Sequence, residues 1–142
     1  MKREFKAAPS ERQHRSVLPQ GGVMNDRSTV DEIVRRAYAA YEAKDRAALE
    51  ATLADHFTFT SPQDDRIDRR TYFERCWPIN EEIEYCRIEK LFVEGNEAFV
   101  RYACKRKGGA PFRNAELFRV ESGKIVEVQV FFGFTAHDIA AA

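Results

Sequence analysis

The sequence predicts an α+β fold, in which three N-terminal helices pack in the concave face of a strongly curved antiparallel sheet and give the domain the shape of a cone. Two patterns carry this prediction. Apolar residues recur mostly at helical spacing through residues 28–77, and at every second position through residues 81–134. Long strands of one sheet twist and must curl around something, and the apolar helix faces can fill the concave side.

The composition limits the class of protein. The 142-residue chain has room for one domain. Its 23 Lys and Arg balance its 23 Asp and Glu, so no net field attracts nucleic acid or an anionic membrane, and we expect neither as a partner. The three cysteines have no metal-ligand spacing, and no signal peptide or run of roughly 18 apolar residues is present. We therefore expect reduced thiols, no metal and a cytoplasmic location.

The two ends of the chain carry no periodic pattern. Residues 1–27 are predicted to form a disordered N-terminal extension, which is basic because residues 1–23 hold five Lys or Arg and two Glu. It is either a basic arm for an acidic partner, a leader that does not fold, or an upstream start with Met24 as the true first residue. The small charge excess favours the second and third explanations. The pattern does not determine the structure of the C-terminal tail, residues 135–142.

The helices follow from apolar spacing and capping residues. The first begins after Ser28, with a capping box from Thr29 to Glu32. Asp45 can cap a second, shorter helix, and Asp68 a third that covers residues 69–77 and ends before Pro78. The predicted buried stripes are Val30, Ile33, Val34, Ala37, Tyr38 and Tyr41 on the first helix, Ala48, Leu49, Thr52 and Leu53 on the second, and Tyr72, Phe73, Cys76 and Trp77 on the third.

The strands follow from alternation and turn residues. Residues 56–60 alternate as a short strand that ends at Ser61 and Pro62. Residues 63–68 read as a solvated loop, since arginines interleave with its aspartates and no cation-ligand spacing repeats. Turn signals at residues 95–96, 108–109 and 122–123 then divide residues 81–134 into four strands of a meander. On the last strand, alternation groups Val126, Val128, Val130 and Phe132 toward the core and Ile125, Glu127, Gln129 and Phe131 on the other face.

The strand before the final turn places an acid in the core. Asn114, Glu116 and Phe118 share one face, so Glu116 points into the interior if that face is buried. Burial raises the pKa of a carboxyl group, and a protonated carboxyl can donate a hydrogen bond to a developing oxyanion. Alternatively, an arginine on a neighbouring strand pairs with Glu116, or a bulge turns it to solvent. Tyr102 and Cys104 would line the same cavity.

Two segments, LADHFTFTSP at 53–62 and ELFRVESGKIVEVQVFFG at 116–133, together with the order of elements, carry a family resemblance. The chain resembles the nuclear transport factor 2-like superfamily over residues 28–134, and within it the ketosteroid isomerase-like and SnoaL-like (polyketide cyclase-like) proteins. The resemblance implies the cone-shaped fold and an expected homodimer. It does not imply one reaction, because the superfamily hosts isomerases, cyclases, dehydratases and binding modules.

The catalytic pattern of those families matches only in part. The position of the isomerases' general-base aspartate holds Ser61, and that of their oxyanion tyrosine holds Ala37, with Tyr38 next to it. Their protonated acid aligns with Glu116, while the acid–base aspartate of the cyclases aligns with Val130. The resemblance therefore argues against authentic steroid isomerase or SnoaL-type cyclase chemistry.

The predicted site combines these observations. The candidate catalytic residues are Glu116, Asn114 and Tyr38, and the predicted pocket lining is Phe57, Phe59, Ser61, Tyr72, Trp77, Tyr102, Cys104, Phe118, Val128, Val130 and Phe132. One hypothesis is an enzyme without a cofactor that catalyses proton transfer, dehydration or isomerisation on a small hydrophobic carbonyl compound. The other is a non-catalytic module that binds a hydrophobic ligand or dimerises through the outer sheet face.

Overall fold

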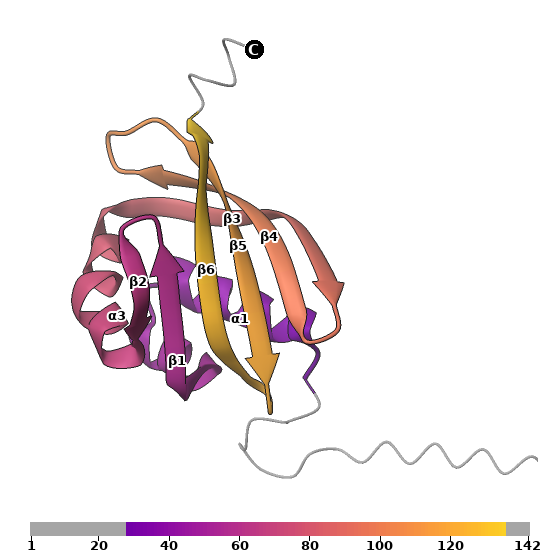
Figure 1. The fold of residues 1–142 in the computed structure, drawn as a ribbon. Helices are drawn as coiled ribbons and strands as arrows, with labels where there is room; N and C mark the ends of the chain where they lie inside the picture. The colour runs from indigo at the N-terminus through magenta and orange to yellow at the C-terminus, as the bar shows by residue number, and fades with distance from the viewer. Residues whose placement is uncertain (1–27, 136–142) are drawn as a thin grey trace, which may run out of the picture.

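The computed structural model describes residues 28–135, and these residues confirm the predicted α+β fold (Figure 1). The predicted extension, residues 1–27, lies outside the described residues, as does the tail apart from Thr135, which ends the last strand. The elements in chain order are α1 Val30–Glu42, α2 Arg46–Thr52, β1 Leu53–Ser61, β2 Asp64–Asp68, α3 Arg69–Arg75, the 3-10 helix η1 Trp77–Glu82, β3 Ile83–Glu94, β4 Glu97–Arg106, β5 Phe112–Glu121 and β6 Lys124–Thr135.

Each of the three α-helices begins at the predicted capping residue. Thr29, Asp45 and Asp68 have extended backbones, and each side chain accepts a hydrogen bond from the backbone N–H three residues further on. The third helix is shorter than predicted, because Trp77 and Pro78 belong to η1. Local sequence alone therefore sets where these helices start.

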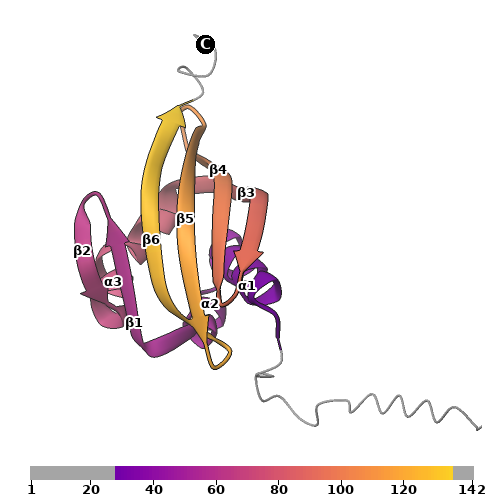
Figure 2. The same cartoon turned by 45° about the vertical axis from the view of Figure 1, so that its right-hand side comes forward.

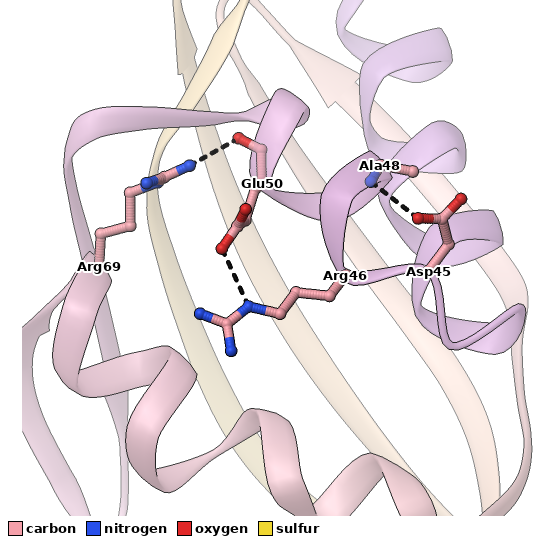
Figure 3. Close-up of polar contacts among 5 residues, drawn as sticks. All are labelled: Asp45, Arg46, Ala48, Glu50 and Arg69. Carbon is pink, nitrogen blue, oxygen red and sulfur yellow. Dashed lines mark hydrogen bonds and ion pairs between the residues drawn. The ribbon is translucent and has the colours of Figure 1, made fainter.

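Helix α2 is tied to the start of α3 by charged side chains (Figure 3). The Arg46 Nε atom lies 3.0 Å from Oε1 of Glu50, and the Arg69 Nη2 atom donates to the backbone carbonyl of Glu50 at 3.0 Å. The Arg46 and Arg69 guanidinium groups also lie over the Phe73 ring, at 4.8 and 5.7 Å from its centroid. These contacts hold α3 at the side of the cone.

The six strands of the described region form one sheet in the order β2-β1-β6-β5-β4-β3. All neighbours are antiparallel except β1 and β6, which run side by side in the same direction (Figures 1 and 2). Two expectations need correction here: the sheet is not entirely antiparallel, and residues 63–68 are not a loop. Residues 64–68 form β2, which pairs with β1 across a tight turn at Pro62 and Gln63.

A β-bulge in β6 reverses part of the predicted alternation. Arg119 pairs with Glu127 and Val120 pairs with Ile125, so Val126 is an extra residue without a partner in this ladder. Ile125 is consequently buried in the main core cluster, whereas the alternation had placed it on the outer face. The prediction for Ile125 was wrong because one inserted residue exchanges the faces of the residues before it.

The core lies between the helices and the concave face of the sheet, and the helices cover only that face (Figure 2). Ile33 and Val34 of α1 are fully buried there, together with Val100 of β4 and Ile125 of β6. No helix within residues 28–135 is long and apolar enough to span a membrane.

Candidate functional site

A cavity of about 550 Å³ opens between α1, α3 and the concave face of the sheet. All but one of the predicted lining residues border it: Phe57, Phe59, Ser61, Tyr72, Tyr102, Cys104, Phe118, Val128, Val130 and Phe132. The exception is Trp77, whose ring packs edge-on against Tyr41 and at a tilt against Phe73. Phe132 is 56% exposed and lies at the cavity mouth together with Phe134.

Glu116 of β5 lies in the wall of this cavity. The residue is half-buried and borders the cavity. The Tyr38 hydroxyl donates a hydrogen bond to its Oε2 atom at 2.7 Å. Neither alternative considered for Glu116 is found. The arginines of the neighbouring strand β4, Arg101 and Arg106, pair with Glu89 and Glu82 instead.

Burial without a counter-charge changes the proton affinity of this acid. Desolvation raises the pKa of Glu116 from 4.5 to about 7, and hydrogen bonds from Tyr38 and Tyr102 oppose the rise. None of the ion pairs among the described residues involves Glu116. Glu116 can therefore exchange a proton near neutral pH.

The direction of each hydrogen bond around Tyr102 follows from one backbone group. The Gly133 N–H can only donate, so it fixes Oδ1 of Asn114 as its acceptor, at 3.1 Å. The Asn114 Nδ2 atom then faces the Tyr102 hydroxyl, to which it donates at 3.1 Å. Because Tyr102 accepts from Asn114, its own proton is available for Glu116. Asn114 therefore acts on Glu116 through Tyr102.

The two tyrosines remain protonated donors. Burial, with the neighbouring Glu116 as the next cause, raises the pKa of both Tyr38 and Tyr102 above the ordinary value of 10. Their rings meet edge to face with centroids 5.7 Å apart. Tyr38 comes from α1 and Tyr102 from β4, so helix and sheet each supply one donor to the acid.

Several polar residues of the cavity were not predicted as site residues, among them Tyr41, Cys86 and Asp64. Tyr41 was interpreted as a core residue of the α1 stripe. Cys86 on β3 is the register partner of Cys104 on β4. Their mutual hydrogen bond raises the pKa of Cys86 and lowers that of Cys104. The alternation of β3 could have revealed Cys86, but its pairing with Cys104 depends on the register.

Asp64 was assigned to a solvated loop, and this assignment was wrong. It opens β2, pairs with Ser61 in the β1–β2 register, and exposes only 9% of its side chain. The sequence does contain a signal for β2: the segment Ser-Pro-Gln-Asp directly follows an apolar strand, and such a turn reverses the chain to form a hairpin. Within residues 28–135, no three His, Cys, Asp or Glu side chains gather as metal ligands do.

Comparison with known proteins assigns the family. The model of the SnoaL-like domain matches residues 34–128, about two thirds of the chain. The chain belongs to the SnoaL-like domain family. None of the curated proteins compared with it gives a significant match.

Solved structures share the fold of this chain. A nuclear transport factor 2-like protein of unknown function from Cytophaga hutchinsonii is 24% identical, with a TM-score of 0.63 over 74% of this chain and 90% of that one. A provisionally assigned polyketide cyclase from Pseudomonas putida is 19% identical, with a TM-score of 0.61 over 75% and 92%. An LEH-like epoxide hydrolase of M. tuberculosis is 18% identical, with a TM-score of 0.62 over 73% and 82%. At these identities the likeness establishes the fold.

Proposed function

We propose that this SnoaL-like domain is an enzyme without a cofactor, which transfers a proton on a small hydrophobic carbonyl compound in an isomerisation or a dehydration. Glu116 is the residue that exchanges the proton. One observation carries the proposal: a carboxyl group faces an apolar cavity, accepts hydrogen bonds from two tyrosines and has no cationic partner among residues 28–135.

The surroundings of Glu116 suit acid–base chemistry at neutral pH. A group with a pKa near 7 is present in both protonation states, and such groups contribute roughly 10²–10⁴-fold to a rate. In its protonated state Glu116 can donate to a carbonyl oxygen. After it loses the proton, the hydroxyls of Tyr38 and Tyr102 stabilise the carboxylate. Asn114 keeps Tyr102 in the orientation that this requires.

The ligand is expected to be small, uncharged and largely apolar. Aromatic and aliphatic side chains form most of the cavity wall, and Glu116 is among its polar groups. Two structural neighbours are named for activities on organic molecules, polyketide cyclisation and epoxide hydrolysis. Steroid isomerase chemistry is not proposed, because Ser61 stands where that family has its general base.

The test is proton exchange in heavy water. Enolisable ketones, led by β-tetralone, are incubated with the protein, and proton NMR follows the loss of the signal from the carbon next to the carbonyl. Glu116→Gln is expected to lower the enzymatic rate at least about 100-fold. Glu94→Gln, a matched change at an exposed position of β3, should leave it unchanged. Full activity of Glu116→Gln, or no exchange above the buffer rate by the wild type, contradicts the proposal.

A second candidate function is a non-catalytic module that binds a hydrophobic ligand or forms a homodimer, and the outer face of the sheet favours the dimer. Phe92, Phe99 and Phe131 are 65%, 45% and 49% exposed, and the rings of Phe99 and Phe131 lie 6.3 Å apart. A contiguous apolar patch of this kind is typical of an interface. A dimer by light scattering that Phe99→Asp converts to a monomer supports the assignment, and a monomeric wild type refutes it.

We also propose a cytoplasmic location and no nucleic-acid or membrane partner. Cys76, Cys86 and Cys104 are free thiols, which suits a reducing compartment. The balanced charge of the chain offers no field for polyanions. Fractionation of cells that produce the protein tests the location.

A further inference from the structure

The cavity is bordered by a second carboxylate, which lies three strands away from that of Glu116 in the sheet. Asp64 is the first residue of β2 and borders the cavity together with Ser61, its register partner on β1. Directly opposed residues of an antiparallel pair point to the same face, so the turn at Pro62 and Gln63 brings Asp64 to the face that Ser61 occupies.

The contacts of Asp64 leave one oxygen for a ligand. Its Oδ1 atom is buried and makes an ion pair with Nη2 of Arg75 at 2.9 Å, without a hydrogen bond. Its Oδ2 atom accepts a hydrogen bond from the Ser61 hydroxyl at 2.9 Å, and the Cys76 thiol lies 4.0 Å away. A carboxylate oxygen can accept more than one hydrogen bond, so Oδ2 is the atom that can take a proton from a ligand.

Cys76 does not compete for this role. Burial, followed by the adjacent Asp64 carboxylate, raises the pKa of the Cys76 thiol to about 11. A protonated thiol is a weak donor and a poor nucleophile, so the carboxylate is the basic group at this side of the cavity.

The sheet register relates the two acids. Thr60 of β1 pairs with Gln129 of β6, so the next residues, Ser61 and Val130, lie at the same level, and Val130 pairs with Glu116 of β5. Two strand spacings, roughly 10 Å, separate the backbones of Ser61 and Glu116. Asp64 lies one strand further along the sheet, on β2. Both acids border the cavity, so a bicyclic ketone bound there with its oxygen at Glu116 can also contact Asp64.

We propose that Asp64 is the proton acceptor of this cavity and works opposite Glu116 as the proton donor. This inference rests on the proposed function, and it places the base on β2, three residues after the position where the related isomerases carry theirs. The hydroxyl of Ser61 orients the Asp64 carboxylate, and Arg75 supplies its counter-charge from outside the cavity.

The proton transfer balances without a further reactant. The C–H bond next to the carbonyl breaks, its proton bonds to Oδ2 of Asp64, and its electron pair forms the double bond of an enol. The carbonyl oxygen takes the proton of Glu116, so the enol carries no charge. Return of the Asp64 proton to a different carbon, with recovery of the other proton by Glu116, completes an isomerisation. Two acids in unlike surroundings are suited to these opposite roles.

The experiment compares four proteins in the β-tetralone exchange assay: the wild type, Asp64→Asn, Asp64→Glu and Asp65→Asn. Asp65 is the exposed neighbour of Asp64 on β2 and provides the matched control. We expect Asp64→Asn to lower kcat at least about 100-fold with little change in KM, and Asp65→Asn to behave as the wild type. Asp64→Glu, which keeps the carboxylate, should recover part of the rate.

The conservative variant separates a chemical role from a structural one. Loss of rate in Asp64→Asn with recovery in Asp64→Glu indicates that the carboxylate itself takes part. Wild-type exchange by Asp64→Asn, together with loss of exchange in Glu116→Gln, overturns the role of Asp64 and leaves the proposed function intact. Full exchange by both variants refutes the proposed function itself. If Asp64→Asn fails to fold, Asp64→Ser takes its place, and wild-type exchange by a folded Asp64→Ser overturns the inference.

Discussion

Replacing Glu116 with glutamine is expected to change how the folding stability depends on pH. Burial raises the pKa of Glu116 from 4.5 to about 7, so between these two values the native protein holds a proton that the unfolded chain releases. The contribution of Glu116 to stability is therefore complete below about pH 4.5 and is lost as the pH rises to about 7. Glutamine has no proton to lose and removes this dependence.

The size of the effect follows from the same pKa. A difference of about 2.5 between the native and ordinary values corresponds to roughly 3 kcal/mol over the whole titration. Most of this titration falls between about pH 5 and pH 8. Over that range we expect the difference in unfolding free energy between Glu116→Gln and the wild type to change by roughly 2–3 kcal/mol. Other carboxylates titrate as well, but they are the same in both proteins and cancel in the comparison.

Urea unfolding of the wild type and Glu116→Gln at several pH values measures this difference. The stability of Glu116→Gln relative to the wild type should increase steadily from acidic to mildly alkaline pH and level off above about pH 8. Glu94→Gln, at an exposed position, serves as the control. A difference between wild type and Glu116→Gln that stays constant with pH would refute the raised pKa, and with it the argument from burial.

Two further substitutions test the groups around Glu116. Tyr38→Phe removes the 2.7 Å hydrogen bond to the Glu116 carboxylate, which is worth roughly 1.5–3 kcal/mol. The pKa of Glu116, measured by NMR titration, should therefore rise by about one to two. An unchanged pKa would contradict the role of Tyr38. Gly133→Ala would put a methyl group 2.0 Å from the carbonyl oxygen of Arg113, so urea unfolding should report a loss of roughly 1–3 kcal/mol. In the control Gly109→Ala, the added methyl group would lie 3.5 Å from the carbonyl oxygen of Arg106, so little change is expected, and equal losses would argue against the close approach at Gly133.

The sequence was sufficient for features that depend on nearby residues. Apolar spacing and the side chains of Thr29, Asp45 and Asp68 place the three helices, and the turn residues place the four strands of the meander. Alternation along β5 was also enough to group Glu116 with Asn114 and Phe118. These signals act within a few residues, so no tertiary information is needed to interpret them.

Features that depend on distant pairing could not be obtained in this way. Strand β2 has one apolar residue, Ile67, and it forms because β1 offers an edge to pair with. The parallel contact of β1 with β6 joins segments about 70 residues apart. The bulge at Val126 leaves no clear mark in the sequence, yet it moves Ile125 into the core. Asp64 was missed for the same reason, since its place in the cavity depends on β2.

The central claim is that Glu116 exchanges its proton near neutral pH inside the cavity. Carbon-13 NMR of the glutamate side-chain carboxyl groups, recorded across a pH titration, measures this directly, and Glu116→Gln identifies the resonance. We predict one glutamate with a midpoint of about 7, absent from the spectrum of Glu116→Gln. Titration of all glutamates at ordinary values of about 4 to 5 would contradict the account.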